Sequence, residues 1–81
     1  MQVKVRLFAS LRETAGLSDI LLELPAGSTA EDAWDGLVRD VPAFAPRRTS
    51  LAASVNRCYA RFDTALHDGD EVVFIPPVSG G

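Results

Sequence analysis

Two stretches that alternate between apolar and polar residues, followed by one stretch with helical spacing, constrain the fold of this chain most. Val3, Val5 and Leu7 alternate with polar residues, and residues 19–24 repeat the pattern. A two-residue period is typical of a strand with one buried face. The connection over residues 8–18 ends in a Gly-Leu-Ser turn and is predicted to be a loop. The two strands should therefore form an antiparallel hairpin.

The third stretch has the period of a helix with one apolar face. Ser28 or Thr29 can cap its start, with Glu31 or Asp32 three residues later as the partner in a capping box. Pro42 ends the helix because proline lacks the N–H that a helix interior needs. The apolar face consists of Trp34, Leu37, Val38 and Val41.

The rest of the chain predicts a loop and three further strands. Residues 43–50 form a loop that can include a short helical turn. Residues 51–55 and 58–62 are predicted to be two short strands around an Asn-Arg turn. Residues 67–70 are a strong turn signal. Residues 71–75 form the last strand, and its apolar character on both faces places it inside the sheet.

Together these elements predict an α+β fold, the ubiquitin-like β-grasp arrangement, in which one main helix packs across a mixed four- to five-stranded sheet. Residues 1–75 are expected to form the single domain, because 81 residues leave room for only one core. Residues 76–81 are predicted to be a flexible C-terminal tail that ends in Gly-Gly.

The composition limits the class of partner. The net charge of −3 argues against binding to nucleic acid or to an anionic membrane, since both require a basic surface. The one adjacent basic pair, Arg47-Arg48, is expected to flank a solvated loop. A single cysteine indicates a reducing compartment, and no apolar run is long enough for a membrane span or signal peptide. We therefore expect a cytoplasmic protein.

The side chains offer no conventional active site. His67 is the only histidine and is expected to be solvated beside its turn. Cys58 is the only cysteine, and its alternation with Tyr59 predicts a small buried hydrophobe rather than a nucleophile. Neither has a second histidine or cysteine with which to complete a metal site. We therefore predict no metal and no cofactor bound by this chain.

Strand phase predicts an exposed apolar patch just before the tail. If Phe74 points inward, then Ile75 points outward, and the same reasoning places Phe8 and Tyr59 on the outer face. A contiguous apolar patch marks a partner site, whereas an error of one residue in phase would bury these side chains. The patch is expected to be rimmed by three basic residues: Lys4, Arg6 and Arg61.

The tail is the candidate reactive element. Pro76-Pro77 fixes φ at about −65°, which ends the strand and stiffens the exit. Val78 could anchor to a pocket wall, and Ser79 could donate a hydrogen bond. Gly80 and Gly81 lack a Cβ and can enter a narrow slot, where Gly81 would present an α-carboxylate. The tail therefore suits threading into another protein's active site, although a frayed terminus is the simpler alternative.

Four motifs, in this order, resemble the small subunit of molybdopterin synthase over essentially the whole chain. The F-A-x-x-R-E start, the D-G-D-E-V hairpin and the P-P-V-S-G-G end are together highly specific. Gly-Gly alone would indicate only a sulfur carrier or a ubiquitin-like modifier. The motifs are Leu7-Phe8-Ala9-Ser10-Leu11-Arg12-Glu13, Val55-Asn56, Leu66-His67-Asp68-Gly69-Asp70-Glu71-Val72 and Pro76-Pro77-Val78-Ser79-Gly80-Gly81.

The resemblance implies a sulfur carrier that is not catalytic alone. An ATP-dependent activating enzyme would adenylate Gly81, and sulfur from a sulfur donor would replace AMP to leave a thiocarboxylate. With the tail inserted into the large subunit of molybdopterin synthase, that sulfur would attack cyclic pyranopterin monophosphate and build its dithiolene. Tyr59 stands where we expect an aliphatic residue in the partner surface. The residues assigned to this surface are Phe8, Arg12, Tyr59, Arg61 and Ile75.

Three alternatives remain at this stage. A sulfur carrier for another pathway, such as thiazole synthesis, would use the same tail chemistry, although such chains are usually shorter and lack the Pro-Pro-Val-Ser lead-in. A ubiquitin-like modifier would join Gly81 to lysines of target proteins. A plain interaction module would have an inert tail and would not need Gly81.

Overall fold

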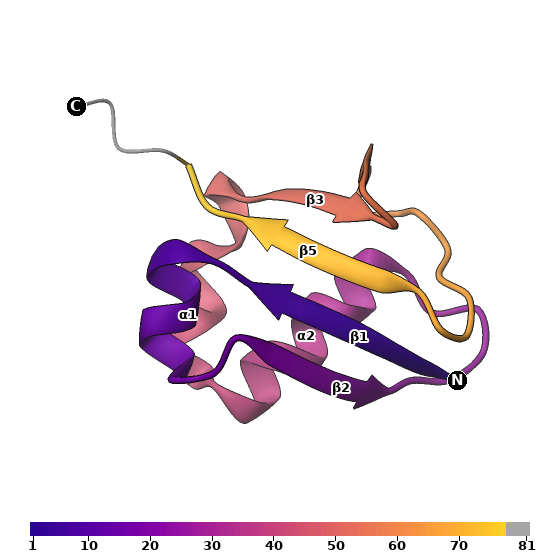
Figure 1. The fold of residues 1–81 in the computed structure, drawn as a ribbon, viewed down its shortest axis with the longest axis horizontal. Coiled ribbons are helices and arrows are strands. Elements are labelled where there is room, and N and C mark those ends of the chain that lie inside the picture. Colours follow the sequence, from indigo (N-terminus) through magenta and orange to yellow (C-terminus); the bar gives the residue numbers. More distant parts are fainter. Residues whose placement is uncertain (78–81) are drawn as a thin grey trace.

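The computed structural model describes residues 1–77, and the tail residues Val78, Ser79, Gly80 and Gly81 lie outside the described part. Within residues 1–77, five strands and three helical segments follow one another (Figure 1). In order they are β1 (Gln2–Leu7), α1 (Ala9–Ala15), β2 (Asp19–Glu23), α2 (Ala30–Asp40), the 3₁₀ helix η1 (Pro42–Ser50), β3 (Ala52–Val55), β4 (Cys58–Ala60) and β5 (Glu71–Ile75).

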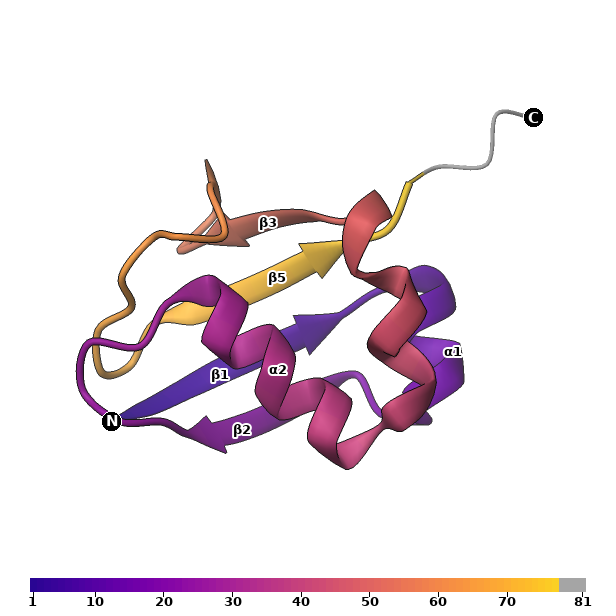
Figure 2. The same cartoon turned by 180° about the vertical axis from the view of Figure 1, so that it is seen from behind.

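The strands form one mixed sheet in the order β2-β1-β5-β3-β4. β1 and β5 are parallel, and the other three pairings are antiparallel. Helix α2 packs across one face of this sheet (Figure 2). The predicted β-grasp architecture, the hairpin of β1 with β2 and the interior position of β5 are therefore confirmed.

The core lies between the sheet and α2. Val3, Val5 and Leu7 are buried as their two-residue period predicts. The rings of Trp34 in α2 and Phe74 in β5 pack edge to face, with 5.1 Å between the ring centroids. Burial of a large aromatic side chain stabilises the fold by roughly 1.5–3 kcal/mol, so this contact fixes α2 on the sheet.

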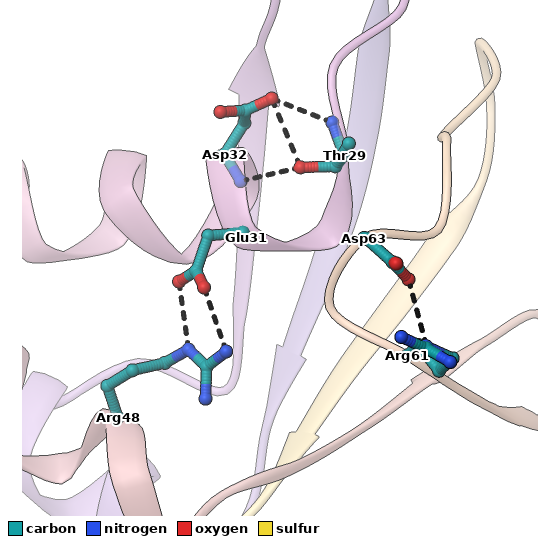
Figure 3. A network of polar contacts seen from close by, with 6 residues as sticks. All are labelled: Thr29, Glu31, Asp32, Arg48, Arg61 and Asp63. Atoms are coloured by element: carbon teal, nitrogen blue, oxygen red, sulfur yellow. Dashed lines mark hydrogen bonds and ion pairs between the residues drawn. The ribbon is translucent and has the colours of Figure 1, made fainter.

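The start of α2 is a capping box made by Thr29 and Asp32 (Figure 3). The Thr29 hydroxyl oxygen accepts a hydrogen bond of 3.3 Å from the Asp32 N–H. The Thr29 N–H donates in return to the Asp32 carboxylate at 2.8 Å. Of the two pairs that the sequence allowed, Ser28 with Glu31 and Thr29 with Asp32, the structure uses the second.

The prediction of a loop over residues 8–18 was wrong, because residues 9–15 form α1. The helix ends at Gly16, whose φ of 74° is left-handed and whose N–H donates to the Arg12 carbonyl oxygen at 2.8 Å. Only Leu11 of this helix is buried. One apolar anchor in two turns gives too weak a period to recognise, although glycine after Ala15 was a usable helix-end signal.

The segment predicted as a loop with a short helical turn is helical over its whole length. Residues 42–50 form η1, and Phe44 within it is fully buried. The Phe44 ring stacks on Trp34 with centroids 5.4 Å apart. Tertiary packing of this one aromatic side chain therefore orders a segment that its two prolines would otherwise favour as coil.

The predicted burial of Cys58 was wrong, because its side chain is exposed. Its strand phase was right, since Cys58 lies opposite Val55 and shares the core side of the sheet with it. However, β4 has three residues and is an edge strand, so its core-side position lies at the margin of the sheet. His67 is exposed, as predicted.

Candidate functional site

The candidate site is the corner of the sheet at which β5 ends and the tail begins. β1 and β5 run parallel with Leu7 opposite Phe74, so both strands reach the same end of the molecule (Figure 1). Phe8 is still extended, with φ −126° and ψ 160°. Phe8 and Ile75 therefore occupy neighbouring positions, directly before Pro76.

The sheet face opposite α2 presents a continuous row of side chains behind this corner. Arg6 lies opposite Val73, Val73 opposite Ser54, and Ser54 opposite Tyr59. Residues that are directly opposite in a sheet point to the same face. Ile75 lies opposite Ala52 in the next row. Leu21, opposite Lys4, also lies on this side but on β2. We define the docking face as five other apolar or aromatic residues on this side: Phe8, Ala52, Tyr59, Val73 and Ile75.

Exposure agrees with the predicted strand phase. Phe8 is 45% exposed and Tyr59 is 83% exposed, and both are among the few large exposed hydrophobic residues of the described chain. Ile75 is half-buried because it lies between neighbouring strands. Phe8 and Ile75 are brought together at the corner, and Tyr59 lies on the same face on β4. Ala52 was not predicted to lie on this face, although its alternation with the buried Ala53 is a usable signal.

Charged side chains border the docking face. The Arg6 Nε lies 3.4 Å from a carboxylate oxygen of Asp19, and its Nη1 lies 3.9 Å from one of Glu71. The Arg6 guanidinium carbon is 5.8 Å from the Phe8 ring centroid, within the range of a cation–π contact. Arg6 therefore holds the Phe8 ring in place, and the carboxylates of Asp19 and Glu71 largely neutralise the charge of Arg6.

The two other predicted partner residues lie apart from the strands of this face. Arg61 directly follows β4 and pairs with Asp63 at 3.2 Å (Figure 3). Arg12 is exposed on α1, so it belongs to the helix at the end of the sheet rather than to its surface. Both side chains remain candidates for contacts around the docking face.

The sequence predicted that Arg48 flanks a solvated loop, but its side chain is paired within the fold. Its guanidinium donates two hydrogen bonds of 2.8 Å to the Glu31 carboxylate (Figure 3). The guanidinium carbon also lies 3.4 Å from the Phe62 ring centroid. The hydrogen bonds from Arg48 lower the pKa of Glu31, and the same bonds raise the pKa of Arg48. This contact joins η1 to the first turn of α2.

The D-G-D-E motif has a structural role at the end of the sheet away from the tail. The Asn56 side-chain amide donates to the Asp70 carboxylate at 2.9 Å, and the His67 N–H donates to it at 2.8 Å. The first of these hydrogen bonds is the main cause of the lowered pKa of Asp70, and the second adds to it. The Asn56 oxygen accepts from the Glu71 N–H at 2.9 Å. These bonds tie the β3–β4 turn to the start of β5.

The described part of the tail consists of Pro76 and Pro77. Pro76 is half-buried and Pro77 is exposed. The predicted roles of Val78, Ser79, Gly80 and Gly81 fall outside residues 1–77.

Within residues 1–77, no group of three or more histidine, cysteine, aspartate or glutamate side chains could hold a metal ion. In the same range, every helix is too short or too polar to cross a membrane.

Comparison with known proteins adds a family match. A family model described as the ThiS family matches residues 5–81. The molybdopterin synthase sulfur carrier subunit of Chlamydomonas reinhardtii is 40% identical over 83 residues, which cover 100% of both chains. The Arabidopsis thaliana protein of the same name is 36% identical over 81 residues, which cover 100% of this chain and 84% of that protein.

Solved structures show the same fold. The crystal structure of SAMP1 from Haloferax volcanii superposes with a TM-score of 0.92 at 31% identity and covers 100% of both chains. A ubiquitin from Caldiarchaeum subterraneum superposes with a TM-score of 0.67 at 17% identity, over 100% of this chain and 98% of that one. The second match bears on the fold alone and confirms the ubiquitin-like architecture.

Proposed function

The chain belongs to the ThiS family, and we propose that it is the sulfur carrier subunit of a molybdopterin synthase. The observation that supports this most is the full-length identity of 36–40% to two proteins of that name. Both relatives are named as a subunit, which supports a second chain as partner. The proposal includes a cytoplasmic location, in which the lone Cys58 would stay reduced.

Gly81 provides the reactive group in this proposal. An α-carboxyl group has a pKa of roughly 3.3–3.7, so it is an anion and a poor acyl donor at neutral pH. An ATP-dependent activating enzyme would convert the Gly81 carboxylate into an acyl-adenylate. A sulfur donor would then displace AMP and leave a thiocarboxylate on Gly81. This chain itself would bind no cofactor and would not be catalytic alone.

The docking face and the tail have separate tasks in the complex. Phe8 and Ile75 would contact the large subunit, because exposed apolar side chains at one corner favour a partner. Arg12, Tyr59 and Arg61 would add contacts around them. The position of this corner, directly before Pro76, supports a single docking event that also delivers the tail.

The tail would then be threaded into the large subunit's active site. Pro76-Pro77 limits the backbone conformations that must be ordered on binding, which lowers the entropic cost. Val78 and Ser79 would contact the walls of the channel, and Gly80 would pass its narrowest part. The sulfur of the Gly81 thiocarboxylate would attack cyclic pyranopterin monophosphate, and hydrolysis of the resulting thioester would leave the sulfur on the pterin and return the Gly81 carboxylate. Two such transfers would build the dithiolene.

Intact mass spectrometry of the chain purified from cells tests this proposal. We expect a species heavier by the difference between one sulfur and one oxygen atom, located on the C-terminal residue. The species should disappear when the purified protein is incubated with the large subunit and cyclic pyranopterin monophosphate, as molybdopterin appears. A sulfur-loaded chain that yields no molybdopterin in that mixture would instead indicate a carrier for another pathway, such as thiazole synthesis.

A ubiquitin-like modifier is the second candidate function. The close superposition on the archaeal protein SAMP1 favours keeping it, since a curated Haloferax volcanii relative at 33% identity is named small archaeal modifier protein 1. Both functions begin with the same acyl-adenylate, so the tail alone does not separate them. High-mass conjugates that require Gly81 would support the modifier, and their absence beside a thiocarboxylate would support the carrier.

A further inference from the structure

Among the strands of the described residues, β2 forms one edge of the sheet and pairs only with β1. Met1 and Leu24 exchange two backbone hydrogen bonds of 2.8 and 2.9 Å, and the Leu7 N–H donates to the Ser18 carbonyl oxygen at 2.8 Å. In an antiparallel pair, alternate residues bond to the neighbouring strand. The backbone groups of Leu21 and Glu23 therefore point away from β1, where no other strand of residues 1–77 pairs with them.

A groove runs between this edge and helix α2. Its floor includes Leu22, Leu24 and Pro25, and Figure 2 shows the end of α2 next to β2. Gly36 of the helix faces Leu22, and a Cβ built there would lie 3.5 Å from Leu22 Cδ1, which is an ordinary van der Waals contact. Leu21 borders the groove on the opposite face of the sheet and is 62% exposed.

The groove is acidic. Four carboxylates and one guanidinium line it. Asp32 is engaged in the capping box, and Glu23 lies 3.9 Å from the N-terminal amine. Asp35 and Asp40 form no ion pair within the described residues. Asp35 interacts electrostatically with Arg48 without forming an ion pair, and both carboxylates can still attract an incoming cation. The charged lining residues are Glu23, Asp32, Asp35, Arg39 and Asp40.

We propose that the β2 edge and this groove bind an extended segment of a partner protein in which basic and aliphatic residues alternate. Such a segment would add a sixth strand by hydrogen bonding to the outward backbone groups of Leu21 and Glu23. Its side chains would alternate between the two faces. Lysine or arginine on one face would lay its aliphatic stem on Leu22 and reach Asp35 and Asp40. Aliphatic residues on the other face would cover Leu21.

Charge decides between this occupant and a second copy of the chain. Two copies paired edge to edge would bring the same carboxylates of both grooves together, and like charges at close range are unfavourable. A basic segment instead neutralises them. The site is separate from the docking face and the tail, so the inference goes beyond the proposed function and does not depend on it.

The test uses the full 81-residue chain and an end-capped nine-residue peptide of alternating lysine and valine. We expect the peptide to shift the amide NMR signals of Leu21 and Glu23 and to slow their hydrogen exchange. Leu21→Pro removes the outward N–H, and proline is tolerated on an edge strand at such a position. We expect this variant to bind at least about tenfold more weakly, whereas Leu21→Thr keeps the N–H and should retain most of the affinity.

Two further measurements test whether charge and strand pairing both contribute to binding of the peptide. Asp35→Asn with Asp40→Asn leaves the strand untouched and should also weaken binding, as should added salt. A peptide of alternating glutamate and valine should not bind. Equal binding of the two peptides, unchanged binding by Leu21→Pro, signal shifts confined to the docking face, or concentration-dependent dimerisation through β2 would each overturn the proposal.

Discussion

The guanidinium of Arg48 donates both of its 2.8 Å hydrogen bonds to Glu31 while its central carbon lies 3.4 Å from the Phe62 ring centroid. One side chain thus joins η1, the first turn of α2 and the segment after β4. Since η1 has only Phe44 fully buried, this contact attaches the segment to the rest of the fold together with the hydrogen bond that Arg47 donates to Ser10.

Arg48→Lys should lower the free energy of unfolding by about 1 kcal/mol. A lysine keeps the charge but loses the bidentate geometry and the stacking of the planar group. The pair is partly exposed, so solvent screening limits the loss. Urea denaturation measures it, with Arg57→Lys as the control in a turn. Equal stability of the two variants would show that the Arg48 contacts contribute nothing specific.

Arg57→Gly should raise the free energy of unfolding by about 1 kcal/mol, because a left-handed backbone costs a non-glycine residue roughly 1–2 kcal/mol. Asn56 and Arg57 have φ values of 50° and 71°, as expected for a two-residue hairpin turn that favours Asn-Gly. Arg57→Ala removes the same side chain but keeps the strain, so its stability should not rise. A gain in both variants would attribute the effect to the arginine side chain instead.

Stability should fall at acid pH through Asp70. Its side chain is only 12% exposed, and the hydrogen bond from Asn56, followed by that from His67, lowers its pKa. Between the lowered pKa and the ordinary aspartate value of about 4, the unfolded chain binds a proton that the folded chain does not. The contribution of Asp70 to the free energy of unfolding is therefore complete above about pH 4, and it is lost as the pH falls through the pKa of Asp70 in the folded chain.

Denaturant titrations from pH 7 to pH 3 on the native chain and Asp70→Asn measure this contribution. We expect the variant to be less stable at pH 7 and the difference to shrink towards pH 3. The lowered pKa of Glu31 affects both proteins equally and cancels in the comparison. A difference that stays constant with pH would rule out titration of Asp70 as the cause.

Phe8→Asp should weaken binding of the large subunit at least about tenfold with little loss of stability. Phe8 is 45% exposed at the corner where the tail begins, so the substitution places a charge in the interface but not in the core. Leu17→Asp provides a matched control, since Leu17 is also exposed but is not part of the docking face. Severe unfolding of Phe8→Asp would show that its role is structural.

One residue added after Gly81 should abolish molybdopterin formation and leave the fold intact. The added residue would displace the reactive carbonyl by about 3.3 Å or more along an extended chain, out of reach of the activating and sulfur-accepting sites. Reconstitution with the large subunit measures the loss, and circular dichroism checks the fold. A retained activity in the extended protein would contradict the role of Gly81.

Periodicity predicted the parts of the fold in which many residues share a pattern. β1 and β2 have several alternating positions, and α2 has both an apolar face and a capping box. The outer positions of Phe8, Tyr59 and Ile75 followed from the same alternation. α1 was missed because Leu11 alone anchors it, and the exposure of Cys58 was missed because strand phase does not reveal a sheet margin.

Contacts between distant parts of the chain were beyond this kind of prediction. Nothing local in the sequence links Arg48 to Glu31 or Phe62, and the pairing exists only because η1 returns beside the start of α2. Phe44 orders η1 in the same way, through Trp34. The groove beside β2 likewise depends on where α2 lies across the sheet, which local sequence patterns do not predict.

The parallel pairing of β1 with β5 joins the two ends of the described chain at the centre of the sheet. During synthesis, β1 can pair with β5, its neighbour at the centre of the sheet, only after almost the entire polypeptide has been made. A chain interrupted before β5 lacks both the tail and the strand that completes its core, so it should be cleared by proteolysis. Such a chain should therefore not accumulate in a folded form that could occupy a partner without a tail.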